Sequence, residues 1–143
     1  LNREQVQAEF KIRIESATPD HQGRIRLTLG EKPAGGVMAN LPSSLHLAHS
    51  SRTSPVILPS GMFQLITVRI ETGDLKTIRL PESREIENSA GSFTLSADNE
   101  DGAVIIRREL RLDKEMIPAG SWPLLRELLL EETDARGRTV ILE

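Results

Sequence analysis

Two histidines, His46 and His49, are the best candidates for metal chemistry in this sequence. In a helical segment, His46-Leu47-Ala48-His49 would turn both imidazole rings toward one ion, but a zinc site needs at least a third protein ligand. Residues 32–70 contain no Asp, Glu or Cys, and His21 stands alone in a predicted turn. We therefore interpret all three histidines as polar loop residues, and we expect no bound metal.

A second candidate site is an acidic turn made of Asp98, Glu100, Asp101 and Gly102. The calcium loop of a helix–loop–helix hand closes with a Glu at its twelfth position. Glu109 holds that position relative to Asp98, but the residues between the turn and Glu109 are apolar and strand-like. The pattern therefore favours a solvated hairpin turn over a calcium site.

Nucleophilic catalysis has no recognisable centre in this chain. The absence of cysteine excludes a thiol nucleophile, and the serines include no Gly-x-Ser-x-Gly elbow, so Ser89-Ala90-Gly91-Ser92 is interpreted as a small-residue turn. Neither phosphate-binding glycine motif is present. Paired carboxylates for glycoside hydrolysis assemble in three dimensions, but only four aromatic side chains could serve both a sugar site and the core. We expect no enzyme active site and no cofactor.

Arg108 is the one charged residue on an otherwise apolar strand face, which comprises Val104, Ile106, Leu110 and Leu112. A charge in such a place needs a partner, since an unpaired buried charge is costly. Arg108 could reach a buried carboxylate or the sheet edge, and we expect a structural ion pair rather than a clamp for substrate.

Composition limits the possible partners. The 143 residues carry 18 basic and 21 acidic side chains, a net charge of -3, with no long run of one sign, so we expect no nucleic-acid surface. No apolar stretch reaches the ~20 residues of a membrane helix, so we expect no membrane span.

Alternating apolar residues predict a mainly β protein. Val6–Glu15 shows the clearest alternation, and with residues 25–29 it predicts a hairpin in a β-annex over residues 1–40. Residues 41–143 are predicted to form an antiparallel β-sandwich-like domain, and the two parts could form one compact unit. Its predicted strands cover residues 56–58, 66–70, 75–80, 84–87, 92–97, 104–112 and 139–142. Phe63 and Leu65 are out of phase with residues 66–70, which predicts a bulge or burial of both faces.

One C-terminal helix interrupts the strands. Ser121 is a suitable N-cap, Pro123 fits the first turn, and Gly137 is the predicted stop. The buried stripe is predicted to consist of Trp122, Leu125, Leu128 and Leu129, widened by Leu124 and Leu130 until most of the helix circumference is packed. Trp122 is expected to lie between helix and sheet.

An ordered series of motifs runs from Arg52 to Leu142: Arg52-Thr-Ser-Pro55, the strand Ile66–Ile70, Leu80-Pro81-Glu82-Ser83, Glu85-Ile-Glu-Asn88, Ala90-Gly91-Ser92-Phe93, Ile106–Leu112, Ile117-Pro118-Ala119, a helix with Trp122 and Leu125-Arg126, and Arg138-Thr-Val-Ile-Leu142. It resembles the uncharacterised C-terminal β-domain of bacterial multidomain proteins that contain a central transglutaminase-like domain. That family often has Tyr at the position of Trp122 and Phe at the position of Leu125, and both differences keep bulky apolar character.

The resemblance implies an accessory domain whose partner is an upstream transglutaminase-like domain of the same polypeptide, in the periplasm, the cell envelope or outside the cell. Any Cys-His-Asp machinery would then lie upstream of this chain. Two other hypotheses stay open. One is a glycan- or peptide-binding module that uses the proline-rich loops 41–62, and the other is a metal-dependent hydrolase around His46 and His49.

Overall fold

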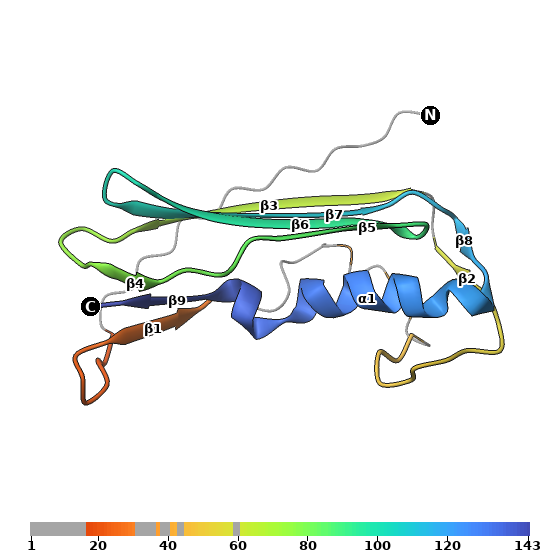
Figure 1. The fold of residues 1–143 in the computed structure, drawn as a ribbon, viewed down its shortest axis with the longest axis horizontal. Helices are drawn as coiled ribbons and strands as arrows, with labels where there is room; N and C mark the ends of the chain where they lie inside the picture. The colour runs from red at the N-terminus through yellow and green to blue at the C-terminus, as the bar shows by residue number, and fades with distance from the viewer. Residues whose placement is uncertain (1–16, 31–36, 38–40, 43–44, 59–60) are drawn as a thin grey trace.

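Two layers face each other in the computed structural model, which describes residues 17–30, 37, 41–42, 45–58 and 61–143 (Figure 1). One layer is a four-stranded antiparallel sheet in the order β3-β7-β6-β5. Its strands are β3 (Met62–Glu71), β5 (Arg84–Asn88), β6 (Gly91–Glu100) and β7 (Ala103–Leu112). The facing layer consists of helix α1 (Trp122–Thr133) and, continuing beyond its C-terminal end, a three-stranded sheet in the order β1-β9-β4. That sheet is made of β1 (Ile25–Thr28), β4 (Thr77–Arg79) and β9 (Thr139–Leu142).

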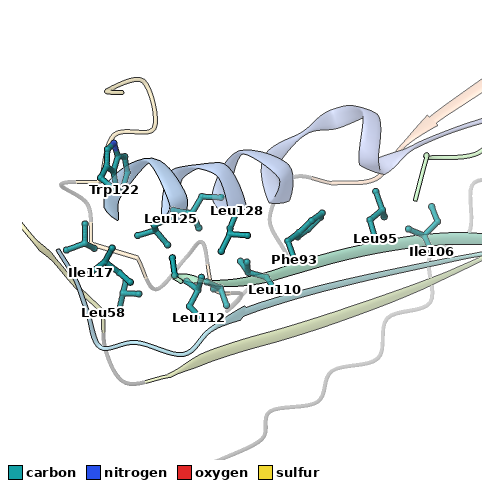
Figure 2. Packing of buried hydrophobic residues seen from close by; sticks show 14 of the residues in the cluster. Leu58, Phe93, Leu95, Ile106, Leu110, Leu112, Ile117, Trp122, Leu125 and Leu128 are labelled. Atoms are coloured by element: carbon teal, nitrogen blue, oxygen red, sulfur yellow. The ribbon is translucent and has the colours of Figure 1, made fainter. Parts of the chain in front are cut away.

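Strand β7 supplies the centre of the core. As the alternation predicted, Val104, Ile106, Leu110 and Leu112 are buried on one face. In β6, Phe93 pairs with Leu110 and Leu95 pairs with Arg108, and both β6 side chains are buried as well. The apolar face of the sheet therefore points toward α1 (Figure 2).

Helix α1 buries the predicted stripe of Trp122, Leu125, Leu128 and Leu129. Leu125 and Leu128 point toward this face, whereas the Trp122 indole, expected between helix and sheet, lies on the other side of the helix beside His49 and Arg52 (Figure 2). Leu124 and Leu130 are 36% and 38% exposed, so the prediction that most of the circumference is packed was wrong. The sheet contacts one side of the helix and the segment around Leu47, His49 and Arg52 contacts its first turns, which leaves Leu124 and Leu130 exposed.

The ends of α1 differ in detail from the prediction. Ser121 occupies the N-cap position and Pro123 lies in the first turn, but the Ser121 side chain makes no capping hydrogen bond. The helix ends at Thr133 rather than near Gly137, because the extended Asp134 leaves the helix and its carboxylate accepts a hydrogen bond from the Arg136 backbone N–H. This contact favours the tight 3-10 turn η3 (Ala135–Arg138), which leads directly into β9.

Short pairings between distant segments close the fold. A two-stranded ribbon of β2 (Val56–Ile57) and β8 (Met116–Ile117) lies near the N-terminal end of α1 and buries Val56 and Ile117; the 3-10 turn η2 (Ala119–Ser121) then leads into the helix. Strand β1 pairs with β9 across the predicted boundary at residue 40. The partner predicted for β1, Val6–Glu15, lies outside the described residues, and the division at residue 40 stays a prediction.

Strand β3 has no bulge near Leu65, because all ten of its residues pair with β7 in unbroken register. Gln64, not Phe63 or Leu65, occupies the inward phase with Ile66 and Val68. Phe63 and Leu65 point away from the core and are 50% and 55% exposed, so burial of both faces was also a wrong prediction.

The predicted fold class is confirmed. Of the described residues, 44% are in strands and 18% in helices, the sheets are antiparallel, and one C-terminal helix packs on a sheet. In the same part of the chain, no helix combines the length and the apolar character that crossing a membrane requires.

We predict that Trp122→Ala lowers the free energy of unfolding by about 3–5 kcal/mol, because the fully buried indole, which packs beside His49 and Arg52, leaves a cavity that its neighbours cannot fill. Leu124→Ala, on the exposed side of the same helix, should cost about 1 kcal/mol or less. Urea denaturation of both variants checks this. Equal losses of unfolding free energy in the two variants would mean that the stability of the helix does not depend on its buried side.

Candidate functional site

The two candidate metal ligands lie on an exposed turn. The rings of His46 and His49 are close, with centroids 5.9 Å apart, but the described residues contain no group of three His, Cys, Asp or Glu that could hold a metal ion. The backbone of this turn is fixed to α1 instead. The Trp122 indole N–H donates to the His49 carbonyl at 2.8 Å, and Arg126 Nε donates to the Leu47 carbonyl at 2.6 Å.

The acidic turn is a hairpin turn, as predicted, but a shorter one. Asp98 and Glu100 belong to β6, and only Asp101 and Gly102 turn, both with positive φ. The carboxylates of Asp98 and Glu100 lie 3.9 and 4.0 Å from the Arg107 guanidinium on β7. The geometry is therefore that of cross-strand ion pairs.

The segment Ser89–Ser92 is a turn whose small residues are required by packing. Asn88 Oδ1 accepts a hydrogen bond from the Ala90 N–H at 2.8 Å. A Cβ on Gly91 would lie 2.0 Å from the Arg111 carbonyl oxygen, and φ there is +153°. Only glycine lets the two backbones approach this closely, so the turn has a structural explanation.

Arg108 forms a structural ion pair, as expected, and of the two partners that the sequence left open its partner is a buried carboxylate. Its guanidinium lies 3.0 Å from Glu132 Oε2 and also donates to the backbone carbonyl of Glu132 at the end of α1. Glu132 Oε1 accepts from Gln64 Nε2 at 2.8 Å, and Gln64 Oε1 accepts from the Val37 N–H at 2.6 Å. These contacts form a polar chain, Arg108–Glu132–Gln64, inside the apolar core.

Arg138 is buried beside this chain. It donates to the Leu29 carbonyl at 2.8 Å and to the Thr133 carbonyl at 3.0 Å. It thereby joins the end of α1 to the segment that follows β1. These contacts hold the end of α1 and the segment after β1 together.

Burial outweighs attraction in the Arg108–Glu132 pair. Removal from water raises the pKa of Glu132 above its ordinary 4.5, although Arg108 and Gln64 act in the opposite direction. The same removal lowers the pKa of Arg108 despite the nearby carboxylate. The two pKa shifts indicate that burial disfavours the charged form of each group, so the pair is a weak source of net stability.

Sequence reasoning missed Glu132 and Gln64, although both carried a signal. Glu132 lies three and seven residues after Leu129 and Leu125, on the same face of α1. Gln64 lies in the inward phase of β3, two residues before Ile66. A polar residue at each of these positions could have been matched to Arg108.

The outer face of the four-stranded sheet, directed away from α1, is the best candidate for a functional surface. Phe63 and Leu65 are exposed there at alternate positions of β3. Arg111 on β7 is the cross-strand partner of Phe63 on β3, and its guanidinium lies 5.1 Å from the centre of the Phe63 ring. Two large apolar side chains thus lie among charged neighbours on an open sheet.

Two hollows extend this outer face toward β5. The larger, of ≈ 550 Å³, is lined by residues that include Leu65, Arg84, Glu85, Thr94, Ser96, Arg107 and Glu109. The second, of ≈ 380 Å³, is lined by residues that include Glu85, Glu87, Asn88, Ser92, Arg111 and Lys114. Both are open, whereas small-molecule sites usually enclose most of their ligand. Mixed charges, hydroxyls and apolar groups on an open sheet suit contact with another polypeptide.

A double-mutant cycle tests the buried pair. We predict that Arg108→Met or Glu132→Leu alone lowers the free energy of unfolding by about 3–5 kcal/mol, because each strands the opposite charge in the core. The double variant should be less destabilised than the sum of the single variants by at least about 2 kcal/mol. Urea denaturation measures all four proteins. Additive losses would show that the two side chains do not depend on each other.

The pH dependence of stability should follow the raised pKa of Glu132. A carboxyl with a higher pKa in the folded state contributes stability that is full below pH 4.5 and is lost as the pH rises through the folded-state pKa. The unfolding free energy of the wild type minus that of Glu132→Gln should therefore decrease as the pH is raised from below 4.5 to neutral. If it rises instead, pairing with Arg108 dominates over burial.

Comparison with known proteins agrees with this architecture. A crystal structure from Parabacteroides distasonis ATCC 8503, of a protein provisionally named as a protease, superposes with a TM-score of 0.71 at 18% identity. The match covers 83% of this chain but only 23% of that one, so it establishes a shared fold within a much longer protein. No curated protein has significant sequence similarity to the chain. Residues 36–142 match the family described as a domain of unknown function with solved structure, and the chain therefore belongs to this family, DUF3858.

Proposed function

We propose that this domain is a non-catalytic accessory domain, which packs on another domain of a larger polypeptide through the outer face of its four-stranded sheet. The observation that carries the proposal is the exposure of Phe63 and Leu65, at 50% and 55%, side by side on that face. Exposed apolar groups rimmed by polar residues are typical of interaction surfaces. Here Arg111 and Glu109 on β7 lie directly opposite Phe63 and Leu65 and supply the polar rim.

The domain's place within a longer chain supports the same proposal. In the Parabacteroides distasonis structure, the shared fold occupies 23% of the chain. Domains of one chain usually meet through surfaces of mixed polarity, which is the character of this outer face. The opposite face of the sheet is covered by α1 and is not available.

The sequence resemblance suggests which neighbour the surface would meet. The motif series from Arg52 to Leu142 resembles the C-terminal domain of transglutaminase-like proteins, so we propose an upstream transglutaminase-like domain as the partner. This chain has no cysteine, and a thiol nucleophile would therefore belong to that neighbour. The same resemblance supports a location in the periplasm, the cell envelope or outside the cell.

Footprinting of the full-length protein tests the surface. We predict that hydroxyl-radical labelling of Phe63 and Leu65 falls several-fold in the full-length protein relative to the 143-residue chain, because docking excludes water from both side chains. Leu124 and Leu130 are matched controls, since they are exposed leucines on the other layer and should label equally in both proteins.

Equal labelling of Phe63 and Leu65 in both proteins would rule out docking through this face. The identity of the neighbour is a separate matter. A full-length sequence without a papain-like domain before Leu1 would remove the transglutaminase-like partner, whatever the footprinting shows.

A further inference from the structure

The outer edge of β3 differs from every other strand edge that the structure describes. Exposed sheet edges invite pairing with further strands, and proteins protect them with short length, charges, prolines or bulges. Strand β5 is five residues long and carries Arg84, Glu85 and Glu87. Strand β4 is three residues long with an irregular register, and β1 and β2 have four and two residues.

Strand β3 has none of these protections along most of its length. It runs for ten residues without a proline and pairs with β7 on one side in unbroken register. Among the described residues, no strand pairs with its other side. Its charged residues, Arg69 and Glu71, lie only at its end.

The inward side chains of β3 are also incompletely covered. Met62, Val68 and Ile70 pack against the core cluster but remain only partly buried, while their partners Leu112, Ile106 and Val104 on β7 are fully buried. The core therefore extends to the β3 edge, and among the described residues no further strand covers these three side chains. A further strand with apolar residues in the inward phase would cover these side chains and bind the free backbone groups of β3.

We propose that the edge of β3 is a strand-addition site and that its occupant is Val6–Glu15 of this chain. That segment lies outside the described residues, and its sequence has the required pattern. It is ten residues long, as β3 is, and its apolar set is Val6, Ala8, Phe10, Ile12 and Ile14. At ~3.3 Å per residue the two lengths match end to end. Its alternate residues, Gln7, Glu9, Lys11, Arg13 and Glu15, suit the polar outer face.

Hydrogen exchange of the 143-residue chain tests the proposal. Every second amide of β3 points away from β7 and is protected only if another strand accepts its hydrogen bond. We expect protection of these amides in the wild type, and a loss of at least about tenfold in Phe10→Ser/Ile12→Ser and in a chain that starts at Ala17. Lys11→Ser/Arg13→Ser is the matched control and should keep the protection. Amides of β6 and β7 should be unchanged in all variants, which shows that the rest of the fold is intact.

Three outcomes would overturn the proposal. The first is rapid exchange of the edge amides in the wild type, and the second is protection that survives Phe10→Ser/Ile12→Ser. The third is protection that rises with protein concentration, which would make a second copy of the chain the occupant. None of these results depends on Phe63 and Leu65 of the outer face, so the proposed domain docking is tested separately.

Discussion

The contact between Arg108 and Glu132 is the constraint around which the two layers are arranged. Arg108 lies in the centre of β7, and Glu132 lies in the last turn of α1, so their contact fixes the end of the helix over one position of the sheet. Because burial disfavours the charged form of both groups, we infer that the pair specifies this position more than it adds stability. Gln64 extends the constraint to β3, and Arg138, beside it, ties the start of β9 to Leu29.

The side chains on the inner face of the four-stranded sheet form the buried core. Phe93 and Leu110 are fully buried, and Arg108 on the same face is buried and paired with Glu132. Chemistry or recognition must therefore use surfaces that the core does not need. In the described part of the chain, the two such surfaces that we propose for recognition are the outer sheet face and the edge of β3.

Much of the fold could be predicted from the sequence because one face of each element is buried. The alternation in β7 and the stripe from Trp122 to Leu129 identified the inward residues correctly. Pairings between distant segments, such as β1 with β9 and β2 with β8, have no local signal. The end of α1 was missed because a cap at Asp134 outweighed the stop expected at Gly137. For the candidate surface, Phe63 and Leu65 were noticed, but their phase was attributed to a bulge or to burial of both faces instead of to exposure.

That error has a physical origin which bears on function. A sequence reader assigns apolar residues to the core, since burial of apolar area is the main stabilising term in folding. Phe63 and Leu65 contribute little of this stabilisation in the isolated chain, because about half of each side chain stays in water. Apolar residues that are exposed, and whose exposure no contact within the fold explains, are expected at functional surfaces. Arg108 also broke the pattern of burial and has its partner, Glu132, inside the fold. Phe63 and Leu65 lie on the outer face opposite Arg111 and Glu109 with about half of each side chain exposed, which is why we propose that face as the docking surface.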